Sequence, residues 1–202
     1  MAEEREPRLS PVPIQSLRPT QLTVGLIEVE ARRDQWREEK KKGKFLGQHM
    51  IPVVIGPRKR PYVVDHHHLA RALHDSGQHQ VLVQPIVNAE DLSQEHFWRF
   101  LDNQGWLHPF DEHGERQPYS AIPKKIAQLK DDPYRSLAGA VRKAGGYAKD
   151  TRPFMEFIWA DYFRGSFSAR DIRRKWDTTL EEAVALARRP EAHFMPGWCG
   201  RR

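Results

Sequence analysis

The sequence of 202 residues predicts an α+β protein, in which a small mixed sheet with helices precedes an all-helical C-terminal region. Short apolar runs separated by turns rich in Pro and Gly fill the chain up to about Glu90, which is typical of strands. Beyond Glu90 the apolar residues recur with helical spacing. The hydrophobic fraction of 39% is ordinary for a folded protein and excludes a wholly disordered chain.

Each element of the N-terminal half follows from a local pattern. Pro13 limits a strand over 12–17 to a sheet edge. A helix over 25–42 ends in three Lys residues followed by Gly43, because cations suit the negative end of a helix. Two apolar runs predict a hairpin with a basic turn, followed by a helix capped by Asp65 and one last strand; these elements cover 51–55, 62–64, 65–76 and 81–87.

The C-terminal half is predicted to be helical throughout. Periodic apolar residues indicate helices over 91–103, 121–130, 133–144, 153–164, 168–176 and 178–188. Thr178 and Glu181 have the spacing of a capping box. The predicted organisation is a flexible tail over 1–10, a sheet domain over 11–90, a helical extension over 91–190 and a C-terminal tail over 191–202.

Bulk charge and apolar content narrow the functional classes. The chain carries 33 Lys and Arg against 27 Asp and Glu, a net charge of +6, which suits phosphate or nucleic-acid partners as well as a solvated surface. No long apolar stretch predicts a membrane span. The single cysteine, Cys199, excludes a disulfide framework. The N-terminus lacks an apolar signal region, so a cytoplasmic location is expected.

The run Asp65-His66-His67-His68, between a predicted strand and a predicted helix, is the main candidate site. A helix start offers unpaired backbone N–H groups and partial positive charge, and imidazoles add further donors for phosphate oxygens. A cap at Asp65 with one packed histidine is the simpler alternative. Adjacent side chains on a helix point about 100° apart, so the three rings cannot share one metal ion, and no metal site is predicted.

Several motifs resemble the ParB/sulfiredoxin fold in the order that fold requires. Residues 63–73 are similar to its strand-to-helix signature, 14–21 to its opening strand and Pro-x-Gln segment, and 51–54 to its second strand. The ParB-like nuclease subgroup is the most similar, because it shares Arg-Pro-Thr-Gln, a following Glu-Val (Glu28-Val29) and the Asp-x-His-His run. The resemblance covers about residues 11–88.

The resemblance implies a nucleotide or phosphate held at the strand–helix junction, with phosphoryl transfer or nucleotide hydrolysis as the activity. ATP, ADP or CTP, with Mg²⁺, are the implied ligands, and a phosphorylated small molecule is a further candidate partner. Two residues depart from the usual signature: His66 replaces Gly, and Leu69 replaces an Arg for which Arg71 could substitute. The implied catalytic residues are Glu28, His67 and His68, and the implied phosphate-binding residues are Thr20, Gln21, Asp65, His66, His67, His68 and Arg71.

Two other functions remain open at this point. A ParB-like nuclease or DNA-binding protein would use the basic turn Arg58-Lys59-Arg60 and the basic helix over 168–176. Alternatively, a non-enzymatic module would bind a partner through its helical half. A sulfiredoxin-type reductase is argued against, because the only cysteine lies far from the junction.

Overall fold

The computed structural model describes residues 10–200, which divide into two compact units. The first unit contains the described residues up to Leu22 together with Val29–Phe110 and Arg116–Leu129. The second contains Thr23–Glu28, Asp111–Glu115 and the chain from Lys130 onward. Helix α1 (Leu26–Glu38) therefore begins in the second unit and continues in the first.

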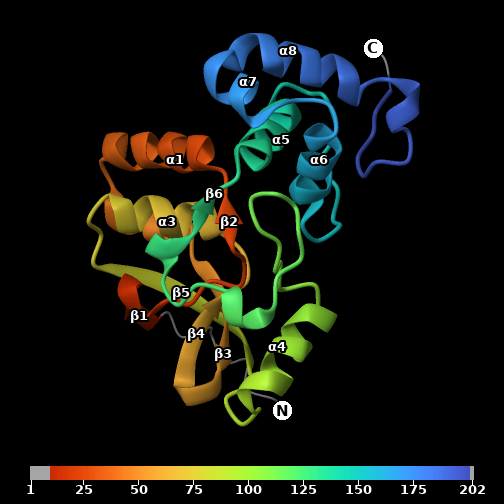
Figure 1. The fold of residues 1–202 in the computed structure, drawn as a ribbon. Helices are drawn as coiled ribbons and strands as arrows, with labels where there is room; N and C mark the ends of the chain where they lie inside the picture. The colour runs from red at the N-terminus through yellow and green to blue at the C-terminus, as the bar shows by residue number, and fades with distance from the viewer. Residues whose placement is uncertain (1–9, 201–202) are drawn as a thin grey trace, which may run out of the picture. The chain divides into compact units, whose positions relative to one another are not determined.

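A mixed four-stranded sheet forms the framework of the first unit (Figure 1). Its order is β1 (Ser10–Pro13), β5 (Gln80–Asn88), β3 (Ile51–Gly56) and β4 (Arg60–Val63). Strands β3 and β5 are parallel, and the two outer pairs are antiparallel. The predicted α+β class and the predicted hairpin are confirmed. The proline-containing strand β1 lies at an edge, as expected, although it starts earlier and ends at Pro13.

Successive side chains along the β3–β4 hairpin point to opposite faces of the sheet. Val54 and Tyr62 pack with Phe97 and Leu101 of helix α4 (Gln94–Asn103). The adjacent Val63 is fully buried and points to the opposite face. Figure 1 shows helix α3 (His67–Asp75) on that side of the sheet. The start of α3 is thus held in place because the strand before it and the apolar face of α3 itself are both buried.

Two predicted elements of this unit differ from the structure. The helix expected over 25–42 ends at Glu38, where Glu39 accepts a hydrogen bond from the Lys41 N–H, and a separate helix α2 (Lys42–Gln48) follows. The helix expected over 121–130 is wrong. The 3₁₀ turn η3 (Tyr119–Ala121) ends as the segment begins, and Ile122 is extended because it precedes Pro123. The rest of the segment contains one further 3₁₀ turn, η4 (Ile126–Gln128).

Helices dominate the second unit. The short parallel pair β2 (Thr23–Val24) and β6 (Lys130–Asp131) precedes α5 (Pro133–Lys143), α6 (Met155–Arg164), α7 (Ala169–Arg174) and α8 (Trp176–Ala187). Trp159 is fully buried and stacks on Tyr147 at 4.3 Å between ring centroids. The capping box expected at Thr178 is wrong, because α8 already starts at Trp176.

The two units and the predicted domains have different boundaries. Helix α4 belongs to the sheet unit because Phe97 and Leu101 pack on the hairpin. The described part of the predicted C-terminal tail, residues 191–200, packs on the helical unit: Trp159 donates a hydrogen bond to the Pro196 carbonyl, and Ala192 is buried. Nearly all of the predicted N-terminal tail lies outside the described residues. Between residues 10 and 200, no helix combines the length and apolar character that crossing a membrane requires.

Candidate functional site

The β4–α3 junction turns sharply at His66. This residue has φ 64° and ψ 26°, in the left-handed region that glycine adopts most easily. The conformation explains why glycine is usual at this position in the resembling signature. Asp65 is exposed, and its Oδ1 accepts a hydrogen bond from the His66 N–H at 2.6 Å. Asp65 therefore shapes the turn, and its predicted role as the helix cap is wrong, because His66 occupies that position without a side-chain cap.

His66 is exposed, and one hydrogen bond orients its ring. Its Nδ1 lies 3.1 Å from the carbonyl oxygen of Met50. A carbonyl oxygen can only accept, so this hydrogen bond places the proton on Nδ1. In the neutral ring Nε2 then carries the lone pair and can accept a proton. The junction thus combines an exposed carboxylate with an oriented, exposed imidazole.

His67 lies inside the first unit and is locked there. The backbone N–H of Thr20 donates to His67 Nε2 at 3.2 Å, so Nε2 is unprotonated. Burial lowers the pKa of His67 to about 3; Asp65 opposes this shift, and His66 and His108 add to it. The ring is therefore neutral across the physiological pH range, and it holds the segment containing Thr20 against the start of α3.

The segment around Thr20 extends the edge of the sheet beside β4. The Arg18 N–H donates to the Pro61 carbonyl at 2.9 Å, and the Val63 N–H donates to the Arg18 carbonyl at 2.8 Å. The Thr20 hydroxyl donates to the Val63 carbonyl at 2.7 Å. These bonds bring together the two motifs on which the resemblance depends, which the sequence separates by more than 40 residues.

His108 is a neighbour of the site that the sequence analysis did not place there. Its backbone N–H donates to the Thr20 carbonyl at 2.9 Å, and its ring influences His67 electrostatically. Gln21 pairs with His108 as an isolated β-bridge and is buried. His68, which follows His67 in α3, is also buried. His108 follows α4 in a loop, so no local pattern in the sequence could have linked it to the junction.

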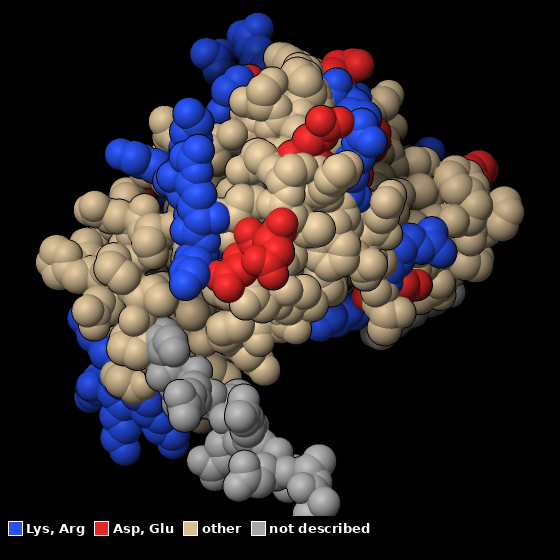
Figure 2. All heavy atoms as spheres, turned by 90° about the horizontal axis from the view of Figure 1, so that it is seen from below, with Lys and Arg blue, Asp and Glu red and all other residues tan. Residues whose placement is uncertain are grey.

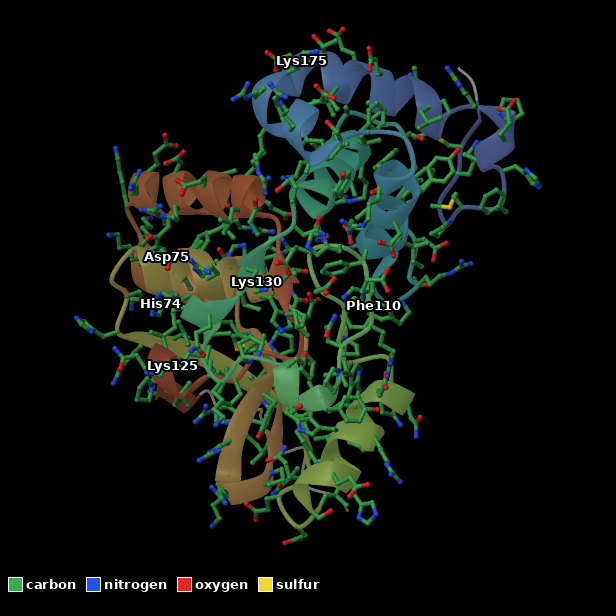
Figure 3. All side chains as sticks on the ribbon, in the orientation of Figure 1. His74, Asp75, Phe110, Lys125, Lys130 and Lys175 are labelled. Carbon is green, nitrogen blue, oxygen red and sulfur yellow. The ribbon has the colours of Figure 1, made fainter. Side chains whose placement is uncertain are left out.

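Arg71 is engaged within α3 and with η4. Its Nε donates to Asp75 at 2.7 Å, and its guanidinium also donates to the Leu129 carbonyl at 2.8 Å. Asp75 accepts a further bond from His74 at 2.9 Å; Figure 3 labels His74 and Asp75 on α3. The hydrogen bonds from His74 and Arg71 lower the pKa of Asp75 although its burial opposes the shift. Arg71 thus has local partners, and its phosphate contact stays a prediction.

Glu28 belongs to the second unit. Its carboxylate lies 3.2 Å from Arg135, which is also 3.8 Å from Glu156 and stacks over Phe157. The side chains of Glu28 and Arg135 are only 13% and 9% exposed. Glu28 is therefore part of a buried ion-pair network of the helical unit, and its role as a general base stays a prediction.

The basic turn of the hairpin is exposed at its tip. Arg58 and Lys59 have φ values of 63° and 58°, both in the left-handed region. Their side chains are exposed, whereas that of Arg60 is half-buried. In the face drawn in Figure 2, Lys and Arg side chains form separate groups rather than one continuous basic surface. Such an arrangement favours local contacts with a few phosphates.

The described part of the chain contains no cluster of three or more His, Cys, Asp and Glu side chains with metal-binding geometry. Asp65 is the exposed carboxylate of the junction. It is thus the residue that could meet a magnesium ion carried in by a phosphate.

Comparison with known proteins assigns the family. A crystal structure of the protein Atu1540 from Agrobacterium tumefaciens is 47% identical in sequence, with a TM-score of 0.92, over 98% of this chain and 99% of the other. A search of curated proteins found no match. Residues 10–165 match the family described as "Putative ParB-like nuclease". That match includes the Arg-Pro-Thr-Gln segment, the hairpin and the junction, and the chain therefore belongs to the ParB-like nuclease family.

Proposed function

We propose that this protein hydrolyses phosphodiester bonds of nucleic acid at the β4–α3 junction. The observation that carries the proposal is the exposed His66 ring, oriented by Met50 beside Asp65 in a chain of the ParB-like nuclease family. Left-handed backbone at a non-glycine residue costs on the order of 1 kcal/mol. A histidine at a position where glycine would fit better supports a role for its ring.

The start of α3 supplies the phosphate-binding part of the proposal. No side chain caps this helix, and the amino end of a helix favours anions through its backbone N–H groups and dipole. Asp65 is occupied with the turn and lies on the exposed side. A phosphate at the helix end would approach Nε2 of His66.

The proposed step is general-base hydrolysis. His66 Nε2 accepts a proton from water while the water oxygen forms a bond to phosphorus. The bond between phosphorus and the leaving sugar oxygen breaks, and that oxygen takes a proton from solvent. His67 is a positioning residue, because its buried neutral ring holds Thr20. Mg²⁺ would neutralise phosphate charge.

Labelled single-stranded DNA, duplex DNA and single-stranded RNA, each with Mg²⁺ or EDTA, test the activity. Wild type is expected to cleave at least one substrate, and His66→Ala to lose about 100-fold or more of the rate, as expected for a lost general base. His96→Ala is the matched control, because His96 is an exposed residue of α4. Equal rates for wild type and His66→Ala would refute the assignment.

The nucleotides implied by the resemblance enter the same experiment as competitors. ATP, ADP and CTP present the same anionic oxygens as a nucleic-acid backbone. If they bind at the junction, each is expected to slow cleavage and raise the melting temperature of wild type. Hydrolysis of the nucleotides themselves, without cleavage of any nucleic acid, would favour a phosphohydrolase over a nuclease.

A further inference from the structure

A second site lies in the first unit, on the α4 side of the β3–β4 hairpin. A cavity of about 180 Å³ opens there, and neither Asp65 nor any of the three junction histidines lines it. Its walls include three aromatic and three basic side chains: Tyr62, Trp98, Tyr119, Arg18, Arg60 and Lys124. We call it the Trp98 pocket. Its lining includes no Asp or Glu.

The aromatic walls are held in fixed positions. Trp98 meets Tyr62 edge to face at 5.4 Å and lies 6.4 Å from Tyr119. The Tyr119 hydroxyl donates to Asp102 at 2.7 Å, and Arg116 neutralises that carboxylate. Trp98 itself is only half-buried. A large ring that is fixed but partly exposed offers a surface on which a planar ligand can stack.

The basic residues of the pocket have capacity for an anion. Arg18 uses one guanidinium nitrogen on the Lys124 carbonyl, while its buried Nε has no hydrogen-bond partner among residues 10–200. Within the same residues, none of Arg18, Arg60 and Lys124 forms an ion pair. A buried guanidinium N–H without a partner is costly, and a ligand oxygen would satisfy it.

We infer that the Trp98 pocket binds one unstacked nucleotide, with the base against Trp98 and the phosphate on Arg18, Arg60 and Lys124. An aromatic platform beside cations is the recurring arrangement for single-stranded nucleic acid, and a duplex keeps its bases stacked. Arg60 also ends the basic turn that carries Arg58 and Lys59, so the backbone of a strand could continue along that turn. The part of this inference in which the nucleotide belongs to a single strand of nucleic acid rests on the proposed function.

Binding of short oligonucleotides in EDTA tests the pocket without requiring cleavage. The probes are fluorescent oligothymidine, an abasic strand of the same length, and a duplex. Wild type is expected to bind oligothymidine about 5-fold to 150-fold more tightly than the abasic strand, the range that corresponds to losing one base stack. Trp98→Leu should lose this preference.

Matched variants separate a local effect from a general one. Trp106→Leu alters another half-buried tryptophan outside the pocket lining and should keep the preference for bases. Arg60→Gln should weaken binding of every strand and make it less sensitive to salt. Arg99→Gln should not, because Arg99 is exposed and paired with Glu95 on α4. If Trp98→Leu does not fold, the Arg60 and Arg99 pair still tests the phosphate contact.

The outcomes distinguish failure of the pocket from failure of the nuclease proposal. If wild type prefers oligothymidine to the abasic strand but cleaves no substrate under any condition, the pocket is supported and the nuclease proposal is refuted. Cleavage with equal binding of oligothymidine and abasic strands overturns the pocket alone. Displacement of oligothymidine by free dTMP from wild type, but not from Trp98→Leu, supports the pocket and shows that a free nucleotide is sufficient. Equal effects of Arg60→Gln and Arg99→Gln overturn the phosphate contact.

Discussion

Replacing His67 with Gln is expected to remove a specific acid sensitivity of the fold. Burial lowers the pKa of His67 from 6.5 to about 3. Between pH 6.5 and about pH 3, His67 therefore binds a proton in the unfolded chain but not in the folded chain. Stability consequently falls as the pH drops below 6.5. At pH 5 the pH lies 1.5 units below the pKa of the ring in the unfolded chain. The free energy of unfolding is therefore about 2 kcal/mol lower at pH 5 than at pH 7.5.

Urea unfolding of wild type and His67→Gln at pH 7.5 and pH 5 measures this effect. The variant should be less stable than wild type at pH 7.5, because the Thr20 N–H loses its imidazole acceptor, and the difference should shrink at pH 5, where wild type loses about 2 kcal/mol. The informative quantity is the pH dependence, which should be smaller in the variant by about 2 kcal/mol. His96→Gln, at an exposed position, should keep the wild-type dependence. A pH dependence unchanged by His67→Gln would refute the inference that this ring is buried and neutral.

Two other substitutions test the structure at single positions. His66→Gly should be more stable than His66→Ala by about 1 kcal/mol in urea unfolding, because both remove the ring but only glycine adopts φ 64° without strain; equal stabilities would contradict the left-handed turn. Gly139→Ala would place a methyl group 3.1 Å from Glu28 and 3.2 Å from Arg135. Gly139→Ala should therefore destabilise wild type, where both paired side chains must give way, and should cost less in a Glu28→Ala variant, where the nearer of the two contacts is gone; additive effects in the double-mutant cycle would show that Glu28 does not occupy this space.

The sequence predicted the sheet unit better than its boundary. Apolar alternation and turn residues located the hairpin, β5 and α3, because these elements follow local rules of spacing. The predicted domain boundary at residue 90 depended on the change to a helical spacing of apolar residues. That spacing does not show which element a helix packs against. Phe97 and Leu101 give α4 an ordinary amphipathic pattern, yet their partners Val54 and Tyr62 lie in the hairpin. Similarly, the periodicity over 121–130 was given more weight than Pro123, which keeps Ile122 extended and so prevents a helix from running through that residue.

Local sequence placed the candidate site but could not distribute roles among its residues. The three histidines are adjacent in the chain and have different environments, because His66 occupies the left-handed turn whereas His67 and His68 begin a buried helix. His67, one of the two histidines that the resemblance made catalytic, is kept neutral by burial and accepts a hydrogen bond from Thr20, whereas His66 is exposed. A non-glycine residue at a left-handed turn carries a backbone cost that glycine would avoid. We therefore propose that His66 carries the chemistry, because a function there would offset that cost, rather than the residues that fit the signature best.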